Sequence, residues 1–172
     1  MDSLVMRRSN LDNLPELPEL PAGYLLRQSM VGDEEQLAAL LSAAFPESEW
    51  SEERARLEFT EDPNVISTFV IEKNGLLVAT STALLSPEEL PCTGIVHWVG
   101  GAPSEKGRRL GFIVTLATLY EFVRIGCKDS LLRTDDRRLP AIKTYLNLGF
   151  TPEFTSVTHP ARWEKIYALL GI

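Results

Sequence analysis

The segment Arg109 to Ile125 constrains the fold most, because it is a helix-length stretch that is apolar nearly all round. A helix without a polar face has to be covered on all sides, so we expect it to lie in the core. Gly126 follows at the position of a C-terminal cap glycine. The chain has 172 residues, which is enough for one domain with a sizeable core around this helix. No stretch of it approaches the roughly 18 apolar residues that cross a membrane.

A β-hairpin is expected before this helix. Val65 to Ile71 and Leu76 to Leu85 are rich in β-forming residues, and Asn74-Gly75 stands between them. Asn-Gly is the strongest short hairpin signal, because both central residues of a type I′ turn need a positive φ. The sequence therefore predicts antiparallel pairing of these two strands.

The rest of the chain alternates strands with helices. Asp33 and Gln36 have the capping-box pattern of a helix start, and Pro140 suits the first position of a later helix. Alternation in the second half predicts parallel pairing there, so the fold class is α/β (α+β) with a mixed sheet. Further strands are expected at Tyr24–Ser29, Gly94–Val99, Asp129–Thr134 and from Phe150, and helices from Asp33 and Ser51 and over Ala141–Leu148 and Trp163–Leu170.

The N-terminal segment differs from the rest. Leu11 to Pro21 reads LDNLPELPELP, and a proline every few residues blocks regular structure. We expect residues 1–21 to form a proline-rich extended N-terminal arm and residues 22–172 to form a single domain, with a loosely ordered tail as the alternative for the arm. Met1 to Asn10 has two arginines but no apolar run. It is therefore not expected to be a signal peptide, and a cytoplasmic location follows.

Charge and cysteine content exclude some functions. The formal net charge is −7, which argues against nucleic-acid binding because that requires a basic face. It weakly favours a cationic or neutral small substrate, although solubility alone also accounts for it. Cys92 and Cys127 are expected to be reduced. With only two cysteines and the distant His97 and His159, we expect no metal site. From the net charge and the lack of a long apolar stretch, we expect no nucleic-acid partner and no membrane partner.

The stretch Val99 to Phe112, VGGAPSEKGRRLGF, joins a strand end to the buried helix through a glycine-containing basic loop. Backbone N–H groups at a helix N-terminus lack intrahelical partners, and the helix dipole favours an anion there. Gly107 and Gly111 allow the backbone to approach a phosphate. Three cations add positive charge to this loop: Lys106, Arg108 and Arg109. We therefore expect a phosphorylated ligand here, with a solvated basic turn as the alternative. The P-loop pattern and the Rossmann glycine fingerprint are both absent.

This loop resembles a known family. PSEKGRRLG is similar to the acetyl-CoA loop of the GNAT superfamily of N-acetyltransferases, commonly written P-x-x-R-G-x-G-x-G/A. Farther on, LPAIKTYLNLGFTPEF resembles the family's A-x-x-x-Y-x-x-x-G-F segment through Ala141, Tyr145, Gly149 and Phe150. The resemblance covers roughly Tyr24 to Phe154 and implies the GNAT fold, in which a mostly antiparallel sheet contains a splayed parallel strand pair and is flanked by helices.

The resemblance also implies where acetyl-CoA, the co-substrate, would bind. Its pantetheine arm would enter the splay and pair with the strand that ends in this loop, like an added strand. Its pyrophosphate would lie on the loop and the helix start. The implied CoA contacts are Trp98, Val99, Gly101, Lys106, Gly107, Arg108, Arg109, Leu110, Gly111 and Phe112. Three positions depart from the family pattern. Lys106 replaces the usual Gln or Arg, Arg109 replaces the middle glycine and is expected to keep a helical backbone, and Arg138 stands where many members have asparagine.

Two residues are implied as catalytic. Tyr145 matches the family tyrosine, and a phenol with an ordinary pKa near 10 can act as a general acid at neutral pH. His97 lies two residues before Val99 on the same strand face and would act as the base. Tyr145 also fits a core aromatic that only positions CoA, and His97 also fits a buried core histidine. Other residues that could serve the acceptor, as bases, amine ligands or pocket walls, are Glu47, Glu49, Glu72, Phe45 and Trp50.

The function implied by the resemblance is transfer of an acetyl group from acetyl-CoA to an amine of a small molecule or peptide, by direct attack in a ternary complex. Two alternatives remain open. One is a catalytically silent acyl-CoA-binding sensor or regulatory module of the same fold, and the other is an α/β domain for a different phosphorylated ligand. Homodimers are common in the family.

Overall fold

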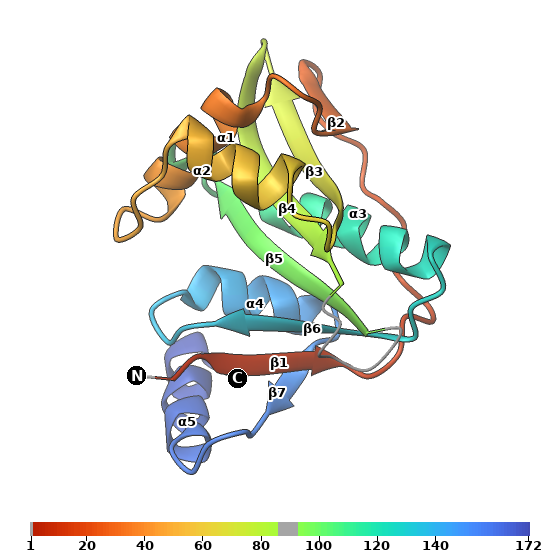
Figure 1. The fold of residues 1–172 in the computed structure, drawn as a ribbon. Helices are drawn as coiled ribbons and strands as arrows, with labels where there is room; N and C mark the ends of the chain where they lie inside the picture. Colours follow the sequence, from red (N-terminus) through yellow and green to blue (C-terminus); the bar gives the residue numbers. More distant parts are fainter. Residues whose placement is uncertain (1, 86–92) are drawn as a thin grey trace.

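The central sheet has seven strands, which lie in the order β2-β3-β4-β5-β6-β1-β7 in the computed structural model (Figure 1). The structure describes residues 2–85 and 93–172. All neighbouring strands are antiparallel except β5 and β6, which are parallel, so the mixed sheet of the α/β class is confirmed. The strands are β1 (Leu4–Arg8), β2 (Tyr24–Gln28), β3 (Val65–Lys73), β4 (Leu76–Leu84), β5 (Thr93–Gly101), β6 (Asp129–Thr134) and β7 (Thr151–Glu153).

Helices cover the sheet on both faces. α1 and α2 cover one face of β3 to β5, and α3 covers the other (Figure 1). α4 and α5 lie by the β6-β1-β7 half of the sheet. The helices are α1 (Glu34–Ala44), α2 (Glu52–Ala55), α3 (Leu110–Arg124), α4 (Leu139–Asn147) and α5 (His159–Leu170), with a π-helical turn after α2 (Arg56–Thr60) and a 3-10 turn before α3 (Pro103–Glu105).

The apolar helix is buried, as predicted. Most α3 side chains, from Leu110 to Phe122, lie in the main hydrophobic core. Val123, which the apolar pattern also placed inside, is 45% exposed. It lies in the last turn of α3. Gly126 has φ 86°, which confirms the C-terminal cap.

The hairpin prediction is confirmed, but one predicted helix cap is wrong. Asn74 and Gly75 have φ values of 51° and 80°, and they join β3 to β4 as an antiparallel pair. Asp33 makes no side-chain cap for α1. Its carboxylate instead accepts hydrogen bonds from Arg27 at 2.7 and 3.0 Å and from the Met30 N–H at 2.9 Å. A cation on the neighbouring strand therefore takes the oxygens that a local cap would have used.

The parallel pair splays, as the resemblance implied. β5 and β6 pair only from Thr93↔Asp129 to Val96↔Leu132. From His97 onward, β5 has no strand partner on its β6 side among the described residues. The sheet therefore opens between the second half of β5 and the end of β6.

The first residues of the chain are part of the sheet, which corrects the expectation that residues 1–21 form only an arm. Leu4–Arg8 is β1 and pairs antiparallel with both β6 and β7. A five-residue run, LVMRR, shows no clear period, and its pairing partners come from the far end of the sequence. Long-range pairing rather than local pattern therefore creates this strand.

The stretch Leu11 to Pro21 has neither helix nor strand, as expected from its prolines. It is held against the domain all the same. Leu11 is buried in the main core, and the Tyr120 hydroxyl of α3 donates a hydrogen bond to the Pro15 carbonyl at 2.9 Å. The segment is therefore anchored to the domain through Leu11 and through α3.

The sequence also led to expectations about membrane spans, metal-binding clusters and the two cysteines. No helix in the described part of the chain is long and apolar enough to span a membrane. Within residues 2–85 and 93–172, no group of three or more His, Cys, Asp or Glu side chains could hold a metal ion. Cys92 lies outside the described residues, so the redox state expected of Cys92 and Cys127 stays a prediction.

Candidate active site

The open edge of β5 carries an irregularity at the point where the sheet splays. The register between β4 and β5 shifts between Thr80 and Thr82, and Trp98 takes a positive φ of 44°. Such a bulge bends a strand and changes the direction of its side chains. Backbone groups from His97 to Gly101 on the side away from β4 are thus left without a strand partner in the described residues.

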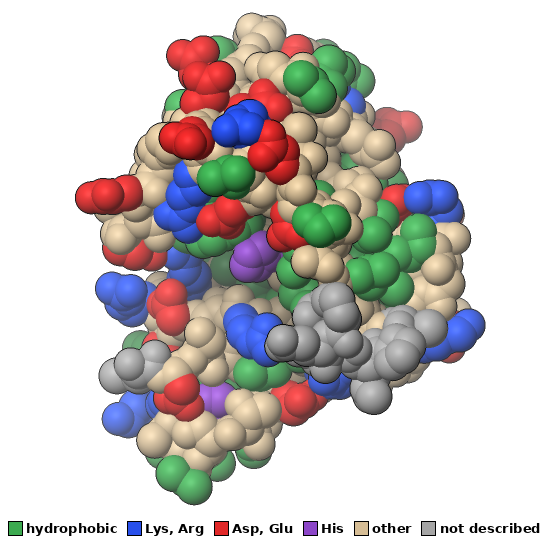
Figure 2. Space-filling model, in the orientation of Figure 1, with side chains coloured by type: hydrophobic (Ala, Val, Ile, Leu, Met, Phe, Trp, Pro, Cys, Tyr) green, Lys and Arg blue, Asp and Glu red, His purple; other side chains and the backbone are tan. Residues whose placement is uncertain are grey.

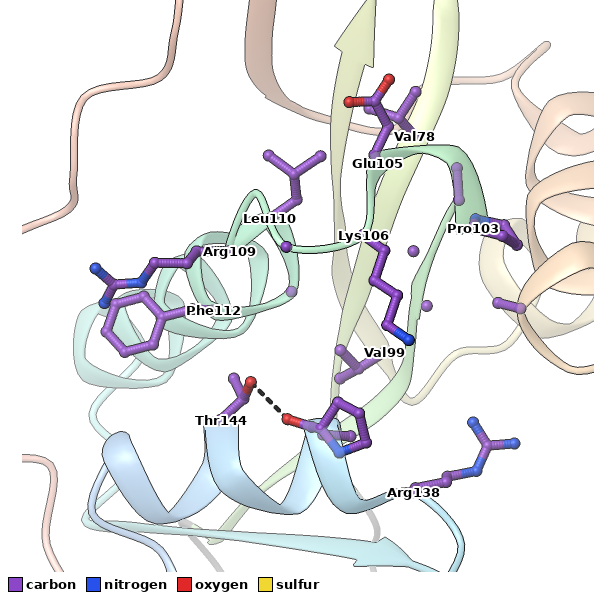
Figure 3. Close-up of a pocket in the computed structure, with 18 of the residues that line it drawn as sticks. Val78, Val99, Pro103, Glu105, Lys106, Arg109, Leu110, Phe112, Arg138 and Thr144 are labelled. Carbon is purple, nitrogen blue, oxygen red and sulfur yellow. Dashed lines mark hydrogen bonds between the residues drawn. The ribbon is translucent and has the colours of Figure 1, made fainter. Parts of the chain in front are cut away.

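A cavity of about 550 Å³ opens beside this edge. Its walls are β5, the loop after β5, the first turn of α3 and one side of α4 (Figure 3). This volume is in the range of small-molecule sites. Tyr145 lines the cavity from α4. Of the residues expected to contact CoA, the cavity is lined by Val99, Gly101, Lys106, Gly107, Arg109, Leu110, Gly111 and Phe112.

The loop and the start of α3 have the features of an anion site. The first N–H groups of α3, from Leu110 to Phe112, have no intrahelical acceptor, and these residues border the cavity. Gly107 has φ 86°, which favours glycine. A Cβ at Gly107 or at Gly111 would have no atom within 4 Å. Open space therefore lies over both glycines, as close approach by a ligand requires.

Arg109 does not have the helical backbone that we expected. Its φ and ψ are 59° and 20°, in the left-handed region, and it precedes α3 rather than belonging to it. This conformation costs a side-chain-bearing residue roughly 1 kcal/mol. The Arg109 guanidinium lies 4.8 Å from the centroid of the Phe112 ring, so a cation–π contact offsets part of that cost.

The loop cations point in different directions. Lys106 extends into the cavity toward Val99 (Figure 3). Arg108 lines none of the described cavities. Its Nε lies 2.9 Å from a Glu105 carboxylate oxygen. The structure therefore does not bring the Arg108 side chain to the expected CoA site.

Glu105 anchors this loop to the outer strands. It accepts hydrogen bonds from the Lys73 ammonium at 2.7 Å and from the Tyr24 hydroxyl at 2.5 Å. These two partners hold the pKa of the Glu105 carboxyl below its ordinary value. Arg108 adds a third contact to the same carboxylate. The 3-10 turn is thereby tied to β2 and β3.

A second cavity, of about 310 Å³, adjoins the first. His97 and Trp98 line this cavity and not the first one. Figure 2 shows a hollow between the α1–α2 side of the molecule and the β6–β1 side, with acidic, basic and histidine side chains around it. The polar and charged side chains of the second cavity are Ser3, Glu47, Ser48, His97, Arg133, Thr134, Asp135 and Arg138. Both cavities share Val99, Arg138, Ala141 and Tyr145.

Known proteins are similar to this chain in sequence and in fold. The chain is 32% identical over 168 residues to a mycothiol acetyltransferase of Nocardia farcinica, which covers 91% of this chain and 54% of that protein. It is 35% identical over 157 residues to a mycothiol acetyltransferase of Thermobispora bispora, covering 85% and 52%. The crystal structure of a GCN5-related N-acetyltransferase from Sphaerobacter thermophilus superposes with a TM-score of 0.70 and 21% identity, over 88% of this chain and 48% of that one.

The chain has the GNAT fold, and over most of its length its sequence is similar to those of these acetyltransferases. It spans about half the length of the relatives that it matches. No family model matches it. The splayed sheet, the glycine loop and the tyrosine of α4 thus occur together in a chain with the GNAT fold.

Tyr145 is almost completely buried, with 6% of its surface exposed. Tyr145 lines both cavities, and its hydroxyl has no hydrogen-bond partner among the described residues. Burial raises the pKa of the Tyr145 phenol well above its ordinary value, while the charge of Arg138 opposes that rise. The phenol is therefore protonated at neutral pH and can donate a hydrogen bond to a ligand.

His97 faces the second cavity from the GNAT splay. Its pKa lies below the ordinary value because the surrounding protein removes part of the hydration of the imidazolium, with the Glu58 carboxylate acting in the opposite direction. The imidazole is therefore neutral near pH 7. Glu58 is fixed by the Trp98 Nε1–H, which donates to it at 2.5 Å, and by Arg54 at 2.8 Å.

The two aromatic residues of the α1–α2 loop, Phe45 and Trp50, have different positions: one lines the second cavity and the other packs against β5. Phe45 lines the second cavity and meets Trp98 edge-on, with ring centroids 5.4 Å apart. Trp50 does not line this cavity. It packs edge-on against Trp98 at 4.7 Å and stacks on Phe59 at 5.7 Å. Trp50 therefore supports the bulged strand from behind.

The three carboxylates expected near the acceptor do not lie together. Glu47 lines the second cavity, whereas Glu49 and Glu72 line none of the described cavities. Glu72 pairs with Arg27 at 3.0 Å on the β2–β3 side of the sheet. Glu47 is thus the acidic residue of this group that the fold brings to the site.

Sequence reasoning missed some cavity residues. Pro140 and Thr144 line the first cavity from α4. Helical spacing from Tyr145 leads one turn back to Ala141 and could have found this face of α4. The sequence did not predict that Glu58 would lie near His97. Glu58 belongs to a π-helical turn, which no pattern in the sequence predicted. Such turns are frequent at functional sites.

Proposed function

We propose that this chain transfers an acetyl group from acetyl-CoA to an amine of a small molecule or peptide, by direct attack in a ternary complex. The observation that carries this proposal is the unpaired edge of β5, which borders a cavity of about 550 Å³ that ends at the anion-binding start of α3. A strand edge suits the amide-bearing pantetheine, and a helix N-terminus suits its pyrophosphate.

The pyrophosphate and the pantetheine of bound acetyl-CoA would contact different parts of the site. The pyrophosphate would accept hydrogen bonds from the backbone N–H groups of Leu110 to Phe112 and would lie near the positive charge of Lys106. The pantetheine would pair with the backbone of β5 at Val99 and Gly101. The thioester would then lie beside Val99 and Tyr145, where the two cavities meet. Of the expected contacts, Trp98 and Arg108 would serve through backbone position rather than through their side chains.

In the proposed reaction the acceptor amine attacks the thioester carbon from the second cavity. A C–N bond forms, the C–S bond breaks, and one proton leaves the nitrogen. A backbone N–H of the bulged β5 would stabilise the negative charge that develops on the carbonyl oxygen. His97 would take the proton from nitrogen, because its lowered pKa leaves it neutral. Tyr145 would act at the departing sulfur, as a hydrogen-bond donor and general acid.

The relatives named mycothiol acetyltransferase make a small-molecule acceptor the first class to test. The mixed charges of the second cavity suit a polar acceptor. Glu47 and Asp135 could receive a cationic amine before its deprotonation, and both belong to the cavity wall.

Two measurements test the proposal. In a thermal-shift titration, acetyl-CoA should raise the melting temperature, whereas ATP and NAD should leave it unchanged. Release of CoA thiol should then follow when amino sugars, amino acids or polyamines are added one at a time. Stabilisation by ATP or NAD instead would indicate a different phosphorylated ligand, and binding of acetyl-CoA without thiol release from any amine would support a silent acyl-CoA-binding module.

A further inference from the structure

Arg138 stands where the two cavities meet. Four residues line both cavities, and Arg138 is the one among them with a long charged side chain. Figure 3 shows it at one end of the first cavity, beyond Val99 and away from the glycine loop. Its side chain is 26% exposed. Arg138 is therefore part of the boundary between the two cavities.

The Arg138 side chain is held from three directions. Its Nη2 donates to Glu47 at 2.7 Å, and its Nε donates to Asp135 at 3.0 Å. The guanidinium carbon lies 4.0 Å from the centroid of the Phe45 ring. Glu47 and Phe45 belong to the α1–α2 loop, whereas Asp135 and Arg138 belong to the β6–α4 loop. The side chain therefore bridges the two sides of the splay.

The backbone of Arg138 is fixed as well. Its N–H donates to the Asp135 carbonyl at 3.1 Å, and its carbonyl accepts from the Ile142 N–H at 2.9 Å in the first turn of α4. A planar guanidinium with two ion-pair partners and a stacked ring has little freedom to move aside. It is therefore a wall of fixed position rather than a mobile surface side chain.

We propose that Arg138 limits the length of the acyl group that this chain accepts. The inference rests on the proposed function, because that function places the thioester between Val99 and Tyr145. A short acyl group would fit on the near side of Arg138. A longer chain would have to separate the guanidinium from Glu47, Asp135 and Phe45, so only short acyl-CoA thioesters are good donors.

The test is the substitution Arg138→Ala, which opens the passage between the cavities. The ratio of kcat/KM for hexanoyl-CoA to kcat/KM for acetyl-CoA is measured with one amine, so that effects on the acceptor cancel. We expect this ratio to rise roughly tenfold or more, the discrimination that methylene groups produce in a tight pocket. The ratio of the two dissociation constants, measured by calorimetry without an acceptor, should shift in the same direction.

Arg137→Ala is the matched control. Arg137 is 81% exposed, lies 3.5 Å from Asp135 and lines neither the first nor the second cavity. It removes the same charge from the same loop and should leave both ratios unchanged. If Arg138→Ala did not fold, Arg138→Gln would shorten the side chain more gently and should raise the ratio by a smaller factor.

The outcomes separate this inference from the function on which it rests. A folded Arg138→Ala protein that turns over acetyl-CoA with the wild-type ratio would overturn the chain-length role alone. An equal change in Arg137→Ala would also overturn it, because loss of charge would then be the cause. A wild-type protein that neither binds acetyl-CoA nor releases its thiol would overturn the proposed function and this inference together.

Discussion

At the scale of single residues, the Tyr145 hydroxyl carries the clearest prediction. Tyr145 is buried and lines both cavities, and its hydroxyl has no hydrogen-bond partner among the described residues. Tyr145→Phe removes this hydroxyl and keeps the ring that packs against Phe150. We expect kcat for acetyl transfer to fall about 100-fold, at the lower end of general acid–base effects, as measured by CoA thiol release.

The same variant provides its own control. No hydrogen bond to the hydroxyl is lost in the described part of the protein, so the melting temperature should stay near that of the wild type. The dissociation constant for acetyl-CoA should also be unchanged. A kcat equal to that of the wild type would leave Tyr145 as a core aromatic that only positions CoA.

The lowered pKa of His97 predicts how kcat/KM depends on pH. Its pKa lies below the ordinary value of about 6.5. If neutral His97 is the base, kcat/KM should therefore be constant near pH 7 and should fall only below about pH 6.5. Glu58 raises the pKa of His97, so Glu58→Gln should move this acid limb to still lower pH. A pH–rate profile measures the acid limb of the wild type and of the variants. If the limb does not move in Glu58→Gln and is still present in His97→Gln, it belongs to another group.

At the scale of elements, the β5–α3 loop depends on one anchor. Glu105 joins the 3-10 turn to Lys73 and Tyr24 on the outer strands. Glu105→Gln keeps an acceptor for the Tyr24 hydroxyl but loses the charge that holds Lys73 and Arg108. We expect the KM for acetyl-CoA to rise about threefold to tenfold, equivalent to roughly 1 kcal/mol, with kcat little changed.

A comparable ion pair away from the loop serves as the control for this anchor. Glu72→Gln breaks the contact with Arg27 on the β2–β3 side of the sheet and should leave the KM for acetyl-CoA unchanged. A steady-state titration of acetyl-CoA at saturating acceptor measures both variants. An equal rise in the two would show that the loss of acidic charge, and not the loop anchor, is responsible.

At the scale of the whole molecule, stability depends on how closely β5 meets α3. A Cβ at Gly94 would lie 2.4 Å from the ring of Phe122, which is fully buried. Gly94→Ala therefore forces the core apart and should lower the free energy of unfolding by about 1–3 kcal/mol. Gly111→Ala is the matched control. Its methyl group would meet nothing within 4 Å, so stability should hold or rise, while affinity for acetyl-CoA should fall.

Urea unfolding followed by circular dichroism measures the free energies, and calorimetry measures the affinity. Equal stability of Gly94→Ala and the wild type would mean that the ring of Phe122 can move without cost. Unchanged affinity of Gly111→Ala would argue against close approach of the pyrophosphate to the start of α3.

The local features of this protein could be predicted from its amino-acid sequence. The buried helix follows from an apolar pattern that leaves no polar face, and the hairpin follows from the positive φ that Asn74 and Gly75 accept. The glycine loop before α3 and the tyrosine segment of α4 were likewise readable from the order of residues. Each depends on interactions within a few residues, which a linear pattern records.

Contacts between groups that are distant in the sequence became visible only in the folded chain. β1 became a strand because β6 and β7 offer it hydrogen bonds from far along the chain. Asp33 gave up its local cap because Arg27, on the neighbouring strand, lies 2.7 Å from its carboxylate. Arg138 likewise became a bridge through Glu47 and Phe45. Charge pairing and strand pairing act over distances that the fold sets, so no short stretch of sequence contains them.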